Sequence, residues 1–164
     1  MNPLHDIILV DLSDQETGTG EKMDVHRRGL MHRAFSVLIY NTSGEMLLQR
    51  RALTKYHSPG LWTNACCSHP RPGESVEAAA SRRLGEELGF HCELNYKGFF
   101  HYIAPFDNGL TENEVDHIFT GIYEGPLTPD PSEVHETRWI TTSELNHWMA
   151  TQPEEFTVWF REIM

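Results

Sequence analysis

A thiol, an imidazole and two carboxylates are the side chains of this sequence whose types and spacing could carry out acid–base chemistry. Cys67 lies two residues before His69, so a strand would place both side chains on one face. Glu112 and Glu114 have the same spacing and would also share a face. A thiol beside a metal ion or cations has a lowered pKa and could form a nucleophile pair with His69. The alternative is that Cys67 is a small buried apolar residue.

Three histidines and the same two carboxylates form a candidate set of metal ligands: His26, His32, His69, Glu112 and Glu114. A mixed nitrogen and oxygen set of this size suits a six-coordinate divalent metal better than tetrahedral zinc. The chain holds 10 histidines, and a single histidine more often has a structural or surface role. The spacing alone therefore does not establish a metal site.

Four cations, Lys22, Arg51, Lys55 and Arg83, could bind an anionic ligand such as a diphosphate. Glu87 could hold a metal ion that bridges to the same phosphates. Arg51 and Lys55 could instead belong to a solvated strand end and loop. Because the chain has a formal net charge of −11, a cluster of cations is somewhat stronger evidence for an anionic ligand than it would be in another chain.

The stretch 76–88 is predicted to be a helix that forms one wall of this polar site. Ser75 is a candidate N-cap, and Gly89 provides a stop. At helical spacing, Arg83 and Glu87 fall on or beside the apolar stripe. A charge in that position is costly unless it meets an opposite charge, a metal or a charged ligand. Glu87 is therefore a candidate functional residue, and Arg83 either shares that function or only neutralises Glu87.

The stretch 68–90 resembles the Nudix box, whose pattern is G-x5-E-x7-R-E-U-x-E-E-x-G-U, where U is apolar. The matching positions are Glu74, Arg82, Leu84, Glu86, Glu87, Gly89 and Phe90. Ser68 stands in place of the first Gly, and Arg83 stands in place of the acid that follows the Arg. Nudix hydrolases use that acid in binding the metals that activate water. Arg83 therefore argues against hydrolysis, while the resemblance still implies a scaffold for metal and diphosphate binding.

A second resemblance is closer and covers most of the chain. TNACCSHP, residues 63–70, resembles the TNxxCxHP signature of the type I isopentenyl-diphosphate Δ-isomerases. These are Nudix-fold enzymes that do not hydrolyse their diphosphate. HRAFSV, RRALTK, PGLWTN and ENEV also resemble segments of this family, from about residue 22 to about residue 159. The resemblance implies isomerisation of isopentenyl diphosphate to dimethylallyl diphosphate in isoprenoid biosynthesis. The alternatives are a Nudix-type diphosphate hydrolase and a non-catalytic prenyl-diphosphate- or metal-binding protein.

The resemblance also implies a role for each candidate residue. Cys67 and Glu114 would be the acid/base pair on opposite faces of the substrate alkene, with Tyr102 assisting. Mn²⁺ or Zn²⁺ would be held by His26, His32, His69, Glu112 and Glu114. Glu87 and the backbone carbonyl of Cys67 would hold Mg²⁺ on the diphosphate.

Substrate binding is implied for the four cations Lys22, Arg51, Lys55 and Arg83, and for two tryptophans. Trp62 and Trp159 would line the pocket, where the ring of Trp159 could face a developing tertiary cation. Core packing is the commoner use of tryptophan and is the alternative for both.

Composition limits the class of protein. The 164 residues are enough for one domain with a core, and we expect a single domain over residues 1–164. The net charge of −11 argues against a nucleic-acid partner. No apolar run is long enough to span a membrane, and residues 1–10 do not form a signal-peptide pattern. An odd count of 3 cysteines predicts free thiols and a cytoplasmic location, and we expect a monomer or a weak homodimer.

The elements that must position these residues alternate between strand and helix patterns. We expect strands at 6–11, 32–40, 46–49, 96–103, 114–123 and 134–140, with a strand beginning at 91–94. Residues 13–20 are predicted to be a polar turn region, and residues 22–26 a helical turn. Later helices are expected at 143–150, capped by Thr142 or Ser143, and at 153–164. This order predicts an α/β protein with a Nudix-like mixed β-sheet sandwiched between helices.

Overall fold

The computed structural model describes residues 6–164, so the expected domain start at residue 1 lies outside the described residues. Its strands are β1 (Asp6–Val10), β2 (Glu16–Glu21), β3 (His32–Tyr40), β4 (Met46–Arg51), β5 (Trp62–Thr63), β6 (Cys66–Ser68), β7 (Asn95–Pro105), β8 (Thr111–Ile122) and β9 (Val134–Ile140). Its helices are α1 (Lys22–Arg28), α2 (Val76–Leu88), α3 (Thr142–Thr151) and α4 (Val158–Ile163), with a 3-10 turn at Pro153–Glu155. No helix within 6–164 has the length and apolar character needed to span a membrane.

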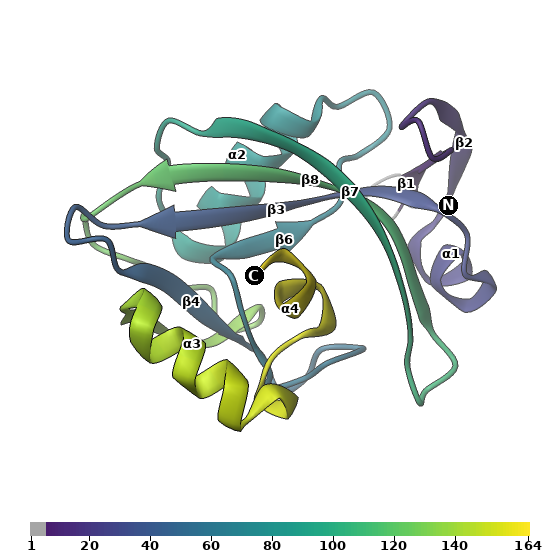
Figure 1. Ribbon diagram of the computed structural model, residues 1–164. Helices are drawn as coiled ribbons and strands as arrows, with labels where there is room; N and C mark the ends of the chain where they lie inside the picture. Colours follow the sequence, from purple (N-terminus) through teal and green to yellow (C-terminus); the bar gives the residue numbers. More distant parts are fainter. Residues whose placement is uncertain (1–5) are drawn as a thin grey trace.

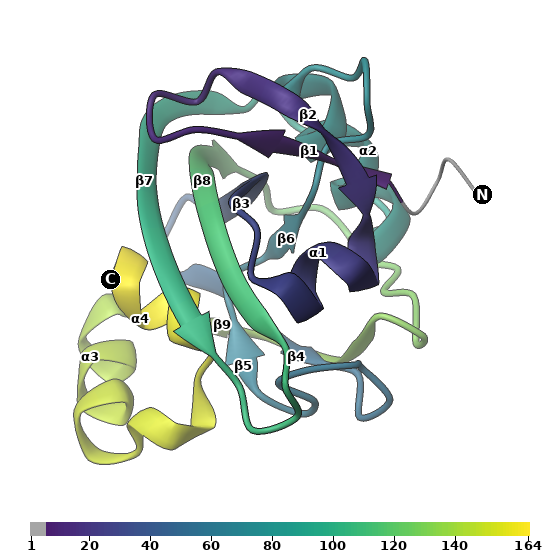
Figure 2. The same cartoon turned by 90° about the vertical axis from the view of Figure 1, so that its right-hand side faces the viewer.

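Strand β3 lies at the centre of one mixed, curled sheet (Figure 1). It pairs parallel with β8, and antiparallel with β1, β4 and β6. The register with β8 places His32 beside Glu114, and the register with β6 places Ser36 beside Cys67. Strands β7 and β8 form a long antiparallel hairpin whose turn end extends past β3 (Figure 2). The thiol and the carboxylate are thus carried on the two sides of one strand.

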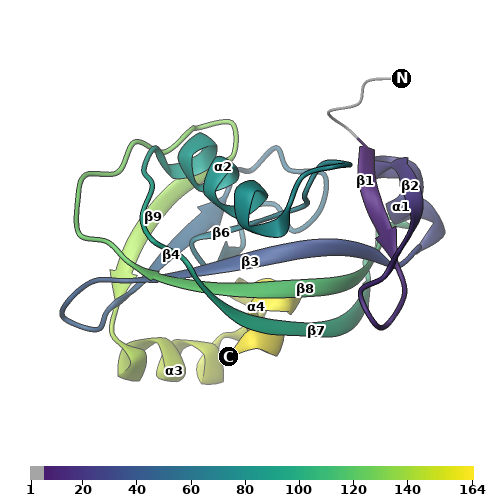
Figure 3. The same cartoon turned by 90° about the horizontal axis from the view of Figure 1, so that it is seen from above.

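Helices cover both faces of the sheet (Figure 3). On one face, the apolar stripe of α2, with Leu84 and Leu88, packs on Phe35 and Val37 of β3. On the other face, α3 and α4 pack on a second cluster that includes Leu38 from the same strand. The alternation of side chains along β3 supplies both cores, because successive residues of a strand point to opposite faces. The predicted sandwich of a mixed sheet between helices is confirmed.

Helix α2 begins and ends where its sequence predicts. The side chain of Ser75 accepts a hydrogen bond from the backbone N–H of Ala78, as an N-cap residue does. Gly89 ends the helix in the left-handed conformation, with φ +76°. Buried Glu87 lies on the inward stripe as expected. Arg83 lies beside it and is partly exposed.

The expectation for residues 13–20 was wrong, because Glu16–Glu21 forms β2, which pairs with β1. This strand lies at the edge of the sheet and contains no large apolar residue, so hydrophobic alternation could not predict it. Residues 91–94 do not form a strand. This segment instead passes very close to Gly121 of β8. A Cβ atom on residue 121 would lie only 2.9 Å from the carbonyl oxygen of Glu93, so only glycine fits there without a shift.

The C-terminal region also differs in detail from the sequence prediction. Helix α3 is capped by Thr141, whose side chain accepts from the N–H of Glu144, and not by Thr142 or Ser143. The expected helix at 153–164 is interrupted because Phe156 and Thr157 are extended. The backbone N–H of Thr157 donates to the carbonyl of Trp62, and its hydroxyl caps α4. This break allows α4 to turn back toward the centre of the sheet.

Candidate active site

A cavity of about 310 Å³ opens between α1, α2, α4, strand β6 and the loop that connects β4 and β5. It brings together most of the residues singled out in the sequence: Lys22, Arg51, Lys55, Cys67, His69, Arg83, Glu87, Glu112, Glu114 and Trp159. Tyr102 reaches the site through Glu114, to which its hydroxyl donates a hydrogen bond. A thiol, carboxylates, an imidazole and cations thus all line the same cavity.

Trp62 occupies a different place from the expected pocket wall. Its ring lies edge-on against Trp148, with centroids 5.4 Å apart, in the core beneath α3. Strand β5 directs this side chain away from the cavity. Trp62 therefore has the packing role that was the alternative for both tryptophans.

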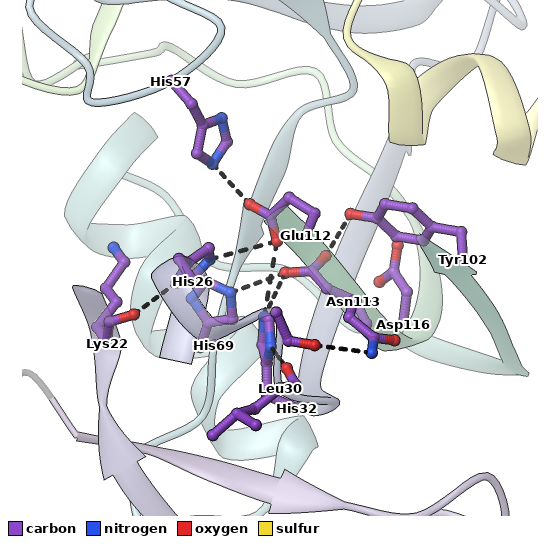
Figure 4. Close-up of polar contacts among 12 residues, drawn as sticks. Lys22, His26, Leu30, His32, His57, His69, Tyr102, Glu112, Asn113 and Asp116 are labelled. Carbon is purple, nitrogen blue, oxygen red and sulfur yellow. Dashed lines mark hydrogen bonds and ion pairs between the residues drawn. The ribbon is translucent and has the colours of Figure 1, made fainter. Parts of the chain in front are cut away.

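Three histidines and two glutamates converge at one end of the cavity (Figure 4). One ligand atom from each of His26, His32, His69, Glu112 and Glu114 lies within 4.8 Å of all the others. Helix α1 carries the first histidine, β3 begins at the second, and the third follows β6. Because successive odd or even residues of β8 share a face, its two glutamates both point into the cluster.

The shortest contacts of this cluster are between imidazole nitrogens and carboxylate oxygens. His32 Nε2 and His69 Nε2 lie 3.0 and 2.9 Å from Glu114 Oε2. His26 Nε2 lies 3.3 Å from Glu112 Oε2. These atoms face one another in the manner of ligands around a shared centre.

The orientation of the rings fits a divalent cation. His26 Nδ1 lies 2.6 Å from the carbonyl of Lys22, and His32 Nδ1 lies 2.9 Å from the carbonyl of Leu30. A carbonyl partner fixes the proton on Nδ1 and leaves Nε2 as the ligand atom. His26 Nε2 and Glu112 Oε2 are buried and have no hydrogen-bond partner among the described residues. A metal ion would satisfy both atoms, so the residues present fit the group.

The charges of the cluster also favour a bound cation. Burial would lower the pKa of His32, but the nearby carboxylates of Glu112 and Glu114 outweigh it and raise the pKa from 6.5 to about 10. Burial and the adjacent charge of Glu112 hold the pKa of Glu114 well above its usual range. Two buried carboxylates this close repel each other, and a bound cation would relieve that repulsion.

Cys67 is the thiol that faces the cavity. Trp159 Nε1 donates to its Sγ at 3.0 Å, and the thiol donates to Asn64 Oδ1 at 3.2 Å. Burial raises the pKa of Cys67 from 9.0 to about 12, with a smaller contribution from the charge of Asp116. The group is therefore a protonated thiol at neutral pH, suited to donating a proton in its resting form.

The neighbouring thiol points the other way. Cys66 is fully buried under α2, and its Sγ donates to Glu87 Oε2 at 2.8 Å. Gln49 Nε2 lies 3.4 Å from the other oxygen of Glu87. The two cysteines thus use opposite faces of β6, one toward the cavity and one toward the helix.

Cations also line this cavity. Arg83 Nη2 lies 3.6 Å from Glu87 Oε2 and 3.3 Å from Glu133 Oε1. Lys55 Nζ lies 2.7 Å from Glu133 Oε2. The ring of Tyr56 lies 4.6 Å from the Nζ of Lys22. Such a group of cations, with a carboxylate able to hold a metal ion, can bind a diphosphate.

Sequence reasoning missed several residues of this site: Tyr56, His57, Asp116 and Glu133. Asp116 could have been found, because it continues the two-residue spacing of Glu112 and Glu114 along β8. It is buried, and the Ser36 hydroxyl donates its one hydrogen bond between the two carboxylate oxygens, at 2.8 and 3.0 Å. His57 and Glu133 lie in loops, where no periodicity marks a residue as pointing inward.

Comparison with known proteins agrees with this geometry. The model of the NUDIX domain matches residues 30–160. A curated relative named isopentenyl-diphosphate Delta-isomerase, from Burkholderia multivorans, is 51% identical over 94% of this chain and 88% of its own length. Another relative of that name, from Serratia proteamaculans, is 49% identical over 96% of this chain and 88% of its own. The chain belongs to the isopentenyl-diphosphate Delta-isomerases of the Nudix family.

Solved structures show the same fold at much lower identity. A crystal structure from Deinococcus radiodurans has a TM-score of 0.74 at 18% identity, and covers 90% of both chains. A MutT protein from Methanosarcina mazei has a TM-score of 0.66 at 20% identity, and covers 80% of this chain and 88% of that one. The Nudix fold expected from the sequence is confirmed.

The box residues that match the Nudix pattern form a structural unit in this chain. Arg82 donates to both carboxylate oxygens of Glu74, at 2.8 and 2.9 Å, and so fixes the turn that precedes α2. It also pairs with Glu86 at 2.9 Å. At the departing position, Arg83 places a guanidinium next to Glu87, where a hydrolase would have a second acid.

Proposed function

We propose that this protein converts isopentenyl diphosphate to dimethylallyl diphosphate by moving a carbon–carbon double bond. The observation that supports this most directly is the meeting of Cys67 and the Glu114–Tyr102 pair in a cavity lined by cations. Strand β3 separates the strands that carry them, which supports an approach to a bound alkene from different sides. Protonation and deprotonation on opposite faces of the alkene would use such an arrangement.

The reaction needs one acid, one base and a dry pocket. One of the two groups donates a proton to C4, and the C3 centre becomes a tertiary cation. The other group removes a proton from C2, and the double bond re-forms between C2 and C3. The protons of both groups exchange with solvent before the next turnover, so the reaction is balanced and consumes no redox cofactor. Tyr102 holds Glu114 in place, and general acid–base groups of this kind contribute roughly 10²- to 10⁴-fold each.

The cationic transition state is stabilised by the walls of the pocket. The ring of Trp159 lines the cavity beside Cys67 and is almost fully buried. An aromatic face attracts a cation, most strongly where water is excluded. Exclusion of water also prevents hydration of the cation.

We infer that two divalent ions take part. Mn²⁺ or Zn²⁺ would be held by the cluster of His26, His32, His69, Glu112 and Glu114, and Mg²⁺ by Glu87 with the Cys67 backbone carbonyl. When bound, these ions neutralise carboxylate and diphosphate charge. Lys22, Arg51, Lys55 and Arg83 would bind and orient the diphosphate, so the reacting carbons lie between Cys67 and Glu114.

A cytoplasmic monomer or weak homodimer, without nucleic-acid or membrane partners, is the setting that we propose. The free state of Cys66, Cys67 and Cys92 supports a reducing compartment. The net charge of −11 disfavours phosphate-rich polymers as partners.

A proton NMR spectrum of isopentenyl diphosphate with enzyme and Mg²⁺ in D₂O tests the function. We expect dimethylallyl diphosphate with deuterium in a methyl group and no release of phosphate or diphosphate. Phosphate release with unmoved double bonds would make the protein a hydrolase. Tight binding with no deuterium uptake would leave a binding protein.

Two variants assign the acid and base. Cys67→Ala and Glu114→Gln should each lose several orders of magnitude in rate, because each removes a positioned group worth roughly 10²- to 10⁴-fold or more. Cys67→Ser should retain at most a trace, since a hydroxyl is a weaker acid than a thiol. Intact isomerisation in Cys67→Ala would move the chemistry to another residue.

A further inference from the structure

His57 contacts the histidine–glutamate cluster from a loop outside it. It lies in the segment 52–61 that joins β4 to β5, and it is only 3% exposed. Its Nε2 lies 2.6 Å from Glu112 Oε1 (Figure 4). This histidine is not one of the five residues whose ligand atoms converge. Its position therefore requires a separate explanation.

Glu112 divides its two oxygens between the cluster and this loop. Oε2 faces His26 Nε2 at 3.3 Å and His32 Nε2 at 3.6 Å. Oε1 faces His57. A carboxylate held at both oxygens has a fixed plane, and metal-binding carboxylates are commonly oriented by such outer partners. His57 is thus placed to set the direction in which Glu112 presents its other oxygen.

The ring of His57 is itself held on several sides. It stacks on Phe106 with centroids 4.8 Å apart and planes 9° apart, and it meets the edge of Trp159 at 5.6 Å. Its carbonyl accepts from Arg51 Nη2 at 3.2 Å. Asn108 Nδ2 donates to the carbonyl of Tyr56 at 2.8 Å. Contacts from the β7–β8 turn, α4 and β4 therefore hold this loop together with the contact between His57 and Glu112.

The same loop also supplies a cation and an aromatic ring to the cavity wall. Lys55 precedes His57 by two residues, and the ring of Tyr56 between them lies 4.6 Å from Lys22 Nζ and 5.8 Å from Lys55 Nζ. A change in the position of His57 would move both side chains, because adjacent residues share a backbone. Within residues 6–164, this short segment contacts both the metal-binding cluster and the diphosphate-binding cations.

We propose that His57 is a positioning residue that couples occupancy of the histidine–glutamate metal centre to affinity for the diphosphate. A cation in the cluster fixes Glu112, Glu112 fixes His57, and His57 fixes the loop that presents Lys55 and Tyr56. Coupling of this kind is reciprocal, so the diphosphate also tightens binding of the cation. The inference rests on the proposed function for the existence of the two sites.

The test measures binding, not turnover. Inorganic diphosphate is titrated by calorimetry into metal-free protein and into protein loaded with one equivalent of Zn²⁺, at the same excess of Mg²⁺. Because Mg²⁺ is constant, the ratio of the two affinities reports the effect of the histidine–glutamate centre alone. In the unmodified protein we expect a ratio of roughly 5- to 150-fold, the usual span of such coupling.

His57→Phe should reduce this ratio to about 1, because it preserves the stack on Phe106 but loses the nitrogen that contacts Glu112. His57→Gln should restore part of the ratio, since its amide can donate to the same oxygen. Zn²⁺ affinity, measured by chelator competition, should fall roughly 10- to 100-fold in His57→Phe, as for other outer partners of metal ligands. Exposed His135 on β9 provides the matched control, and His135→Phe should keep the full ratio.

Several outcomes would overturn the inference. These are an unchanged ratio in His57→Phe, an equal loss of the ratio in His135→Phe, and a ratio near 1 in the unmodified protein. A fall in Zn²⁺ affinity with an unchanged ratio would make His57 a metal-site residue only. Failure of the proposed function has a different signature, which is absence of deuterium uptake in the NMR experiment. The binding ratio is measured independently of that result.

Discussion

Trp159 Nε1 donates a hydrogen bond to Cys67 Sγ across 3.0 Å and so joins the last helix to the strand that carries the thiol. The guanidinium of Arg51, which also lines the cavity, lies 5.2 Å from the same ring. Although only five residues follow Trp159, the C-terminal helix therefore forms part of the cavity wall.

Removing the indole N–H tests whether this bond acts on the thiolate form of Cys67. Trp159→Phe keeps an aromatic face but loses the donor, and we expect kcat to fall about 10- to 100-fold, because a hydrogen bond to a charged group contributes ~1.5–3 kcal/mol. KM should change little. Trp159→Leu also loses the π face and should be slower still. A Trp159→Phe enzyme with unchanged kcat would restrict the indole N–H to a structural role.

Arg83→Glu restores the acid of a hydrolase box next to Glu87. We expect weaker binding of the diphosphate and loss of isomerisation, since a cation becomes an anion beside the phosphates. Calorimetry with inorganic diphosphate and the NMR assay measure the two effects. Arg82→Lys is a useful comparison, because Arg82 pairs with Glu74 and Glu86. Near-normal KM and kcat in Arg83→Glu would show that Arg83 only neutralises Glu87.

Binding of the diphosphate should weaken as the pH rises through about 8. Burial, with a contribution from the charge of Lys55, lowers the pKa of Lys22 from 10.5 to about 8. Below that pH the lysine is charged and attracts the anion, and above it the lysine is neutral. Binding at pH 8–9 should therefore take up protons, which calorimetry in buffers of different ionisation enthalpy detects. Lys22→Arg should bind with a flatter pH profile, and an equal slope in both proteins would contradict the assignment.

As the pH rises, the lowered pKa of Lys22 should weaken diphosphate binding, but it should increase the stability of the folded protein. A lysine whose folded pKa lies below its unfolded value binds fewer protons in the folded state at intermediate pH. The contribution of Lys22 to the free energy of unfolding should therefore increase between pH 8 and pH 10.5. Urea titrations of the unmodified protein and of Lys22→Met across this range would measure the difference.

Chelation should lower the melting temperature. Glu112 and Glu114 repel each other in the buried cluster, and a cation that binds only the folded state stabilises by about 4 kcal/mol when its concentration is 1,000 times Kd. For a chain of this size that corresponds to roughly 8–16 °C. His69→Gln, which loses one ligand, should show a smaller shift on addition of Zn²⁺. Identical melting curves in EDTA and in Zn²⁺ would contradict a metal centre.

The parts of the site that the sequence predicted share a physical cause. Glu112 and Glu114 follow the two-residue period of a strand, and Glu87 follows the period of a helix, so their directions could be inferred before the fold was known. The helix ends at Ser75 and Gly89 were predictable because caps depend on local chemistry.

The parts that could not be predicted depend on tertiary packing. Trp62 packs on Trp148, 86 residues away in sequence, and no local pattern distinguishes that role from a pocket wall. His57 lies in a loop whose path is set by Phe106 and Trp159. Edge strand β2 has no apolar residues whose alternation could identify it.

The opposite directions of Cys66 and Cys67 determine how an oxidant would damage the protein. Adjacent residues of a strand point to opposite faces, so these two thiols cannot form a disulfide with each other unless β6 comes apart. An oxidant that enters the cavity would meet Cys67 as a protonated thiol, which reacts slowly to sulfenic acid because the thiolate is the reactive form. Cys66 is fully buried beneath α2 and is out of reach of the solvent. An alkylating reagent that enters the cavity would consequently label Cys67 and not Cys66, and the rate of labelling would report whether the pocket is occupied.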